Sequence, residues 1–295
     1  MLFRSVTTGP DATQTVTVSA DVAGLSGTTT VTASAGLATF SGLTMTALAG
    51  NYTLTYTANT SGSTGETSFD LTYGAASKLH VSTQAAGFVN RAAFTTQPVV
   101  TVQDSMGNTV ADSAISIDVT IDSGTLTGTT QVRSVAGIAT FTNLGKYGTV
   151  GAKRLTFAKT GGGLTVDTQD FTLTYGAIHH LNVAVAGTLA NDTAWATQPV
   201  VAIQDEDNNT VDITDTVTLT ATGATTVAIG GTTSMQTTNG VANFTGKGVK
   251  LTGLIGAKSL TATIASPSSI TKTETVTITY GAATKLVIST DAADA

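Results

Sequence analysis

The stretch that decides the fold is Asp170-Phe171-Thr172-Leu173-Thr174-Tyr175-Gly176-Ala177. Its apolar Phe, Leu and Tyr alternate with Asp and Thr, the pattern of a β-strand with one face buried and the other in water. The last four residues, Thr-Tyr-Gly-Ala, recur at 72–75 and 279–282, so the tyrosines are 102 and 105 residues apart. This long period indicates tandem domains rather than a short-period solenoid.

Two other motifs return in the same order and at the same period. Gly36-Leu37-Ala38-Thr39-Phe40 matches residues 137–141 and 240–244, and Gln97-Pro98-Val99-Val100 matches residues 198–201. We therefore divide the chain into four parts, which are unit one (residues 1–74), unit two (residues 75–176), unit three (residues 177–281) and residues 282–295. The joints between units are short and hold no flexible Gly/Ser run, so we expect a stiff row of domains.

Unit two shows how each unit is built. We expect strands at residues 78–83, 97–104, 114–122, 129–135, 137–144, 153–160 and 169–175. Many short alternating strands separated by Gly, Asn and Asp turns are typical of an immunoglobulin-like (Ig-like) sandwich. The predicted fold is all-β, with tandem Ig-like β-sandwich domains arranged end to end.

The composition agrees with this fold and excludes several classes of protein. Thr, which favours strands, accounts for 64 of the 295 residues, and only 11% of residues are charged. The net charge of -6 leaves no basic patch for phosphates, so we expect no nucleic-acid partner. The absence of cysteine excludes disulfides and thiolate zinc sites. Since no apolar run approaches the length of a membrane-spanning helix, we expect no transmembrane segment.

A family resemblance follows from the order of motifs in unit two. They are Lys78-Leu79-x-Val81-x-Thr83, Phe94-Thr95-Thr96-Gln97-Pro98-Val99-Val100, Asp104-x-x-Gly107-Asn108 and Gly137-x-Ala139-x-Phe141. This series resembles the bacterial Ig-like repeats of large surface proteins of the invasin and intimin type, and it covers essentially the whole chain. The resemblance implies an extracellular or cell-surface location. It leaves the function open, because such repeats serve in stalks, filaments, surface layers and enzyme accessory regions.

The two ends of the chain are out of step with the repeat. Alignment of Gly27 with Gly128 and Gly231 leaves unit one without its first two strands. The first strand of a further unit is instead found at the other end, in Lys285, Leu286, Val287 and Ile288.

Two interpretations of this offset stay open. In the first, the chain is a window cut from a longer repeat protein. In the second, residues 283–290 are a donor strand that completes unit one of the next chain, which gives a head-to-tail polymer with Lys285 to Ile288 at the interface. An open sandwich leaves unpaired backbone groups, but one donated strand cannot replace two missing ones.

The best candidate ligand site is the acidic loop after the second strand of units two and three. It carries Asp104 and Asn108 in unit two, and Asp205, Asp207 and Asn209 in unit three. Carboxylate and amide oxygens near a domain joint are ligands that calcium prefers, so we predict calcium as the one candidate cofactor. The alternative is that Asp and Asn form Asx turns here without an ion.

No catalytic constellation stands out, because the HExxH, GxSxG, P-loop and GxGxxG motifs are absent, and we do not expect an enzyme. The first functional hypothesis is a stiff segment of a surface stalk, filament or coat, with copies of itself or neighbouring repeats as partners. One alternative is an adhesin that recognises a glycan or cell-surface receptor, for which Trp195 is the lone candidate; its match to Phe94 favours packing inside the unit instead. Another is a non-catalytic spacer of a larger secreted enzyme.

Overall fold

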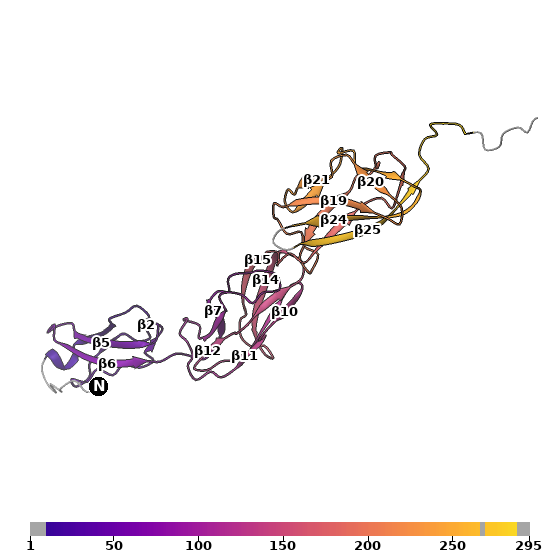
Figure 1. The fold of residues 1–295 in the computed structure, drawn as a ribbon. Coiled ribbons are helices and arrows are strands. Elements are labelled where there is room, and N and C mark those ends of the chain that lie inside the picture. Colours follow the sequence, from indigo (N-terminus) through magenta and orange to yellow (C-terminus); the bar gives the residue numbers. More distant parts are fainter. Residues whose placement is uncertain (1–9, 266–268, 288–295) are drawn as a thin grey trace, which may run out of the picture.

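The computed structural model describes residues 10–265 and 269–287. Apart from one 3-10 turn, η1 (Pro10–Thr13), every helix or strand in these ranges is a β-strand. The chain is therefore all-β, which confirms the predicted fold class. The strands gather into three groups that follow one another in an extended row (Figure 1).

Unit two is a sandwich of two sheets. One has the order β11-β9-β14-β15 and the other β12-β8-β7, with a separate ribbon of β10 and β13. The strands are β7 (Lys78–Thr83), β8 (Val99–Gln103), β9 (Ser116–Ile121), β10 (Thr125–Thr127), β11 (Gln131–Arg133), β12 (Ile138–Thr140), β13 (Gly145–Tyr147), β14 (Gly151–Lys159) and β15 (Asp167–Leu173). Alternate apolar residues of both sheets meet in one core, where the rings of Phe141 and Phe157 pack edge to face with centroids 5.5 Å apart.

Unit three repeats this sandwich and adds one strand. Its sheets have the orders β17-β25-β24-β19-β21 and β16-β18-β22, with a ribbon of β20 and β23. The strands are β16 (His180–Ala184), β17 (Thr188–Ala190), β18 (Val200–Gln204), β19 (Thr216–Thr222), β20 (Val227–Gly230), β21 (Ser234–Gln236), β22 (Val241–Asn243), β23 (Lys250–Gly253), β24 (Gly256–Ile264) and β25 (Ile270–Thr279). The added β17 pairs in parallel with the last strand, β25, and extends that sheet by one strand at its edge.

Unit one keeps one sheet of the sandwich. Its strands are β1 (Thr15–Ala20), β2 (Leu25–Ser26), β3 (Thr30–Thr32), β4 (Thr44–Met45), β5 (Gly50–Ala58) and β6 (Thr64–Leu71). The order β3-β1-β5-β6 matches β11-β9-β14-β15 of unit two, and β2-β4 matches the ribbon. Within residues 10–74 no strand corresponds to β7 or β8. Its core is correspondingly smaller, with Tyr56 packed against Phe40 at 5.5 Å between ring centroids.

The predicted strands of unit two agree with the observed ones except in its middle. The expected strands at 129–135 and 137–144 shrink to β11 and β12, and the ribbon strands β10 and β13 are additional. Three-residue strands are too short to show an alternating pattern. The aligned glycines mark this ribbon instead, because a Cβ on Gly128 would lie 1.9 Å from the carbonyl oxygen of Asn143. Gly27 and Gly231 meet the same obstacle at 2.1 and 2.3 Å.

The predicted donor or first strand, from Lys285 to Ile288, is not a strand over its described part. Residues 281–287 make no sheet pairing, and the side chains of Lys285, Leu286 and Val287 are exposed. Ile288 lies outside the described residues.

Candidate functional site

The acidic loops of units two and three lie where each unit meets the unit before it. Asp104 directly follows β8 and Asp205 directly follows β18. Both side chains are buried, although each lies in a surface loop. A carboxylate is buried in a folded protein only when it is paired or hydrogen-bonded, so the partners of these two groups define the site.

Each carboxylate first closes a turn within its own unit. Oδ1 of Asp104 accepts hydrogen bonds from the backbone N–H groups of Met106 and Asn108, both at 2.9 Å. Unit three repeats both bonds, at 3.0 and 2.9 Å. Gly107 has a φ of 96° in this turn, and Asn208 takes its place in unit three with a φ of 65°. The loops therefore contain the Asx turns that were one of the two interpretations of this sequence.

The second oxygen of Asp104 reaches across the joint to unit one. Oδ2 accepts a 2.8 Å hydrogen bond from the backbone N–H of Gly74 and another 2.8 Å bond from the Asn108 amide. The amide oxygen of Asn108 accepts a 2.7 Å bond from the backbone N–H of Ala49, also in unit one. Two residues of one Asx turn thus hold two backbone segments of the preceding unit.

The joint between units two and three uses the same positions. Oδ2 of Asp205 accepts a 3.0 Å hydrogen bond from the backbone N–H of Gly176, the glycine of the second Thr-Tyr-Gly-Ala motif. The Asn209 amide accepts a 3.0 Å bond from the N–H of Val150 and donates a 3.0 Å bond to the carbonyl of Gly148. This repetition identifies a common joint.

Unit two adds further contacts to this second joint from the segment before β8. Nδ2 of Asn90 donates a 2.7 Å hydrogen bond to Oδ2 of Asp205. The Arg91 guanidinium forms a two-pronged ion pair with Asp207, at 2.8 and 2.9 Å, and lies 3.0 Å from Glu206. The described part of unit one has no segment equivalent to Asn90 and Arg91, so the first joint lacks these contacts.

The joints lower the pKa of their carboxyl groups. Burial on its own would raise the pKa of Asp104, but hydrogen bonds from Asn108, Gly74 and Met106 outweigh it and bring the pKa to about 2. For Asp205, burial likewise acts upward, and bonds from Gly176, Asn209 and Asn90 bring the pKa to about 2. Both groups are therefore ionised across the physiological pH range.

All five predicted calcium ligands belong to these loops. Asp104 and Asn108 meet in the first joint, and Asp205, Asp207 and Asn209 meet in the second. In residues 10–265 and 269–287 there is no group of three or more His, Asp or Glu side chains arranged to hold a metal ion. Calcium binding remains a prediction. The donors Gly74, Gly176 and Asn90 were not predicted from the sequence, although the glycine of the Thr-Tyr-Gly-Ala motif recurs in every unit.

Trp195 belongs to the core of unit three. Its ring is buried with Leu189, Val249 and Ile278, as its match to Phe94 predicts. An adhesin that stacks a sugar ring needs an exposed aromatic surface, which this side chain does not offer.

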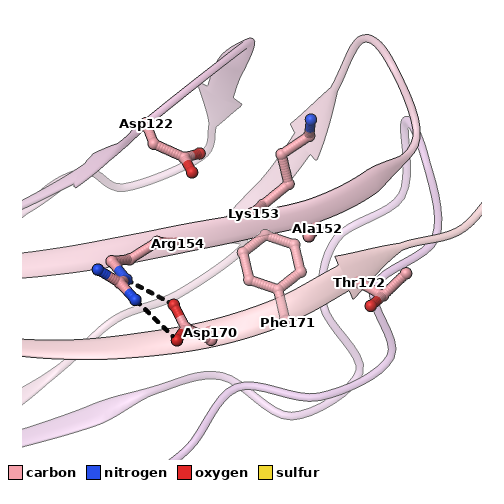
Figure 2. Close-up of a pocket in the computed structure, with 7 residues that line it drawn as sticks. All are labelled: Asp122, Ala152, Lys153, Arg154, Asp170, Phe171 and Thr172. Atoms are coloured by element: carbon pink, nitrogen blue, oxygen red, sulfur yellow. Dashed lines mark hydrogen bonds and ion pairs between the residues drawn. The ribbon is translucent and has the colours of Figure 1, made fainter.

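A surface hollow of about 630 Å³ lies on unit two beside β14 and β15 (Figure 2). Arg154 and Asp170 face each other there in a two-pronged ion pair, with 2.9 Å between Nη2 and Oδ2. Arg154 and Asp170 neutralise each other, and the other two charged residues of the hollow, Asp122 and Lys153, are also opposite in sign, so the hollow offers a ligand no excess charge and the joints remain the stronger candidate.

Comparison with known proteins identifies no family for this chain. No protein-family description matches the sequence, and no curated protein matches it. Within the described residues, no helix is long and apolar enough to cross a membrane.

Several solved structures are distantly similar to this chain. The bacterial integrin-binding protein invasin is 14% identical with a TM-score of 0.36, and the match covers 95% of this chain and 55% of invasin. The Escherichia coli adhesin FdeC is 16% identical with a TM-score of 0.35, covering 89% of this chain and 85% of FdeC. A Parabacteroides merdae β-glucuronidase is 10% identical with a TM-score of 0.27, covering 55% and 21%. The chain thus spans about half of the invasin structure, and likenesses this distant assign no function.

Proposed function

We propose that this chain is a stiff structural segment of an extracellular stalk, filament or coat. The observation that carries the proposal is the buried carboxylate bond that recurs at both joints, from Gly74 to Asp104 and from Gly176 to Asp205. A hydrogen bond to an ionised carboxylate is stronger than one between neutral groups, and burial shields it from water.

The geometry explains how this bond gives stiffness. Each Asp is fixed within its own unit by the Asx turn, and each glycine lies three residues beyond the last strand of the preceding unit, which ends at Leu71 or Leu173. A chain of so few residues, held at both ends, has little freedom to bend. Tension or bending is then shared between neighbouring sandwiches rather than taken up by a loose linker.

Small-angle X-ray scattering of the whole chain tests stiffness directly. We expect an elongated particle, and we expect the double variant Asp104→Ala/Asp205→Ala to have a smaller maximum dimension and a more flexible profile. Asp118→Ala, which removes an exposed carboxylate of β9 away from the joints, is the matched control. Identical profiles for the native chain and the double variant would contradict the proposal. Antibody labelling of intact producing cells tests the extracellular location.

Strand donation is a narrower form of the same proposal. Two apolar surfaces favour it: the exposed Leu286 and Val287 at one end, and a groove of about 130 Å³ in unit one lined by Leu25, Leu43, Thr44, Met45, Leu54 and Phe69. If donation occurs, the chain forms head-to-tail oligomers, and deletion of residues 283–295 abolishes them. Light scattering coupled to size-exclusion chromatography that gives the same mass with and without these residues would exclude donation.

A further inference from the structure

The far end of unit three repeats the surface of unit two on which Asp205 docks. In unit two, the Asn90 amide oxygen accepts a 3.0 Å bond from the N–H of Gly148, and in unit three Asn191 accepts a 3.0 Å bond from Gly253. The glycines that end the units are also equivalent. A Cβ on Gly176 would lie 2.8 Å from the Asn90 carbonyl oxygen, and one on Gly281 would lie 2.6 Å from that of Asn191.

This equivalence places two donors together at the far end. In the second joint, the Asn90 amide and the Gly176 N–H both donate to the same oxygen, Oδ2 of Asp205. Asn191 and Gly281 hold the same two groups in the same local frame. We call this pair the Asn191–Gly281 socket.

The residues around the socket are exposed where their counterparts are covered. Tyr280 is 82% exposed, whereas Tyr175 is 37% exposed and its hydroxyl donates a 3.0 Å bond to the carbonyl of Asp212 in the next unit. Leu286 is 101% exposed, whereas its counterparts, Leu79 and Leu181, are 4% and 1% exposed in the cores of units two and three. The apolar residues that follow the socket thus have the pattern of a buried first strand without the sandwich that would bury them.

The charge next to the socket differs from that of the second joint. Asp192 stands where unit two has Arg91, with φ values of 58° and 64°, and it pairs with Lys250 at 2.7 Å. In the second joint Arg91 holds the acidic Asp207 of the docking loop. The loop of unit two has the uncharged Met106 at the position of Asp207. A carboxylate at that position would meet Asp192, which is already paired with Lys250, instead of the Arg91 that binds Asp207, so it would lack the ion pair of the second joint and stand near a like charge.

We propose that the Asn191–Gly281 socket binds the Asp-x-x-x-Asn loop of a further Ig-like unit that follows in the chain, and that this loop is of the uncharged kind found in unit two. The inference rests on the proposed function, and it adds the partner and its specificity. The Asp of the loop receives the hydrogen bonds of Asn191 and Gly281, and Asp192 disfavours a second carboxylate two residues later in the loop. The described part of unit one has no such loop, so unit one of a second copy does not fill this socket, and a further unit that buries Leu286 and Val287 is the alternative to strand donation.

The test extends the chain after Gly281 with a copy of unit two (residues 75–176) or, in a second protein, with a copy of unit three (residues 177–281). Because the chain has no cysteine, introduced cysteines are the only sites for spin labels. One label pair spans the native joint, at Thr168 and Gln236, and another spans the new joint, at Gln236 and the matching exposed position of the added unit. Pulsed electron paramagnetic resonance gives the distance distribution of each pair.

We expect a narrow distribution across the new joint for the unit-two copy, and a broader one for the unit-three copy. Asn191→Ala should raise the undocked fraction of the unit-two copy about tenfold, the effect of losing one charge-assisted hydrogen bond. Asp192→Arg should narrow the distribution of the unit-three copy. If both copies dock equally well, the specificity is wrong. If neither docks while the native joint stays narrow, the socket is wrong and the proposed function stands. A broad native joint contradicts the proposed function itself.

Discussion

The backbone N–H of Gly176 donates a 3.0 Å hydrogen bond to the buried carboxylate of Asp205, across the boundary between two sandwiches. Gly74 and Asp104 repeat this bond at 2.8 Å, one period earlier in the chain. The same pair of residue types therefore holds two joints whose remaining contacts differ. This relationship, rather than any pocket, distinguishes the joints from ordinary domain linkers.

Replacing Asp205 with Ala should destabilise unit three and loosen its joint with unit two. The change leaves the Asn90 amide and the Gly176 N–H without their acceptor, at a cost of about 2–4 kcal/mol in the free energy of unfolding. Urea denaturation of the full chain measures this cost. Asp170→Ala is the control, because that exposed carboxylate pairs only within its own sheet. Equal unfolding free energies for Asp205→Ala and the native protein would show that the bond contributes nothing.

Acid should open the joints between pH 4 and pH 2. An Asp carboxyl group has a pKa near 3.8 before folding, and both Asp104 and Asp205 have a pKa of about 2 in the folded chain. A lowered pKa means that the unfolded or undocked state binds protons more readily, so this stabilisation is complete above pH 4 and is lost as the pH falls through 2. Scattering profiles recorded from pH 7 to pH 2 should show loss of the extended shape in that window. If the extended shape is already lost at pH 5 to 6, titratable groups other than Asp104 and Asp205 control the joints.

Arg91→Ala should affect the second joint less than Asp205→Ala does. Arg91, whose pKa is raised by its hydrogen bond to Asp207, has a side chain that is 39% exposed, and ion pairs in contact with water contribute little to stability. High salt screens the ion pair, so the native joint should become slightly more mobile as salt is added. The joint of the Arg91→Ala variant lacks this ion pair, so its mobility should not change with salt. Spin-label distances across this joint at low and high salt make the comparison. If Arg91→Ala broadens the distance distribution as much as Asp205→Ala does, the ion pair and not the buried hydrogen bond is the main contact of this joint.

Lys146→Met should stabilise unit two by about 1–2 kcal/mol. Lys146 is buried on the ribbon strand β13, where its ammonium donates a 3.2 Å bond to the Tyr147 carbonyl, and burial lowers its pKa. Unit one has Met45 at this position and unit three has Leu251. The melting temperature of the variant should therefore rise. A decrease would mean that the ammonium has a structural partner whose loss outweighs the gain from burying an apolar side chain.

Calcium offers a direct choice between the two interpretations of the acidic loops. Both oxygens of Asp104 already accept hydrogen bonds from protein groups, so the Asx turn competes with an ion for the same lone pairs. If the Asx turns are complete without an ion, the melting temperature is the same with calcium and with EDTA. If the predicted calcium site is present, the melting temperature rises by several degrees in calcium, and the variants Asp104→Asn and Asp205→Asn then show which loop holds the ion.

The sequence predicted the strands well where the alternation was long. Phe171 and Leu173 mark β15 because a half-buried strand of that length shows its period of two. The three-residue strands β10 and β13 carry no such signal, and their close approach depends on the missing side chain of Gly128. The burial of Lys146 was not predicted either, because a charged residue is normally expected at the surface.

The candidate site was half predictable. The sequence singled out the loops of Asp104 and Asp205 by their residue types, and in the structure each of these Asp residues contacts the Asn of its own loop. The partner was not foreseen, because a backbone N–H leaves no mark in a sequence and Gly176 reaches Asp205 only through the placement of two whole domains. The sequence therefore predicted the loops but not the glycine of the neighbouring unit that binds to them.

The most direct test of the account is the distance distribution across the joint of units two and three, measured between spin labels at Thr168 and Gln236 of the otherwise native chain. Two sandwiches fixed by the Gly176–Asp205 bond give one narrow peak at neutral pH, and Asp205→Ala broadens it. A distribution that is already broad in the native chain, and unchanged in the variant, would contradict the account.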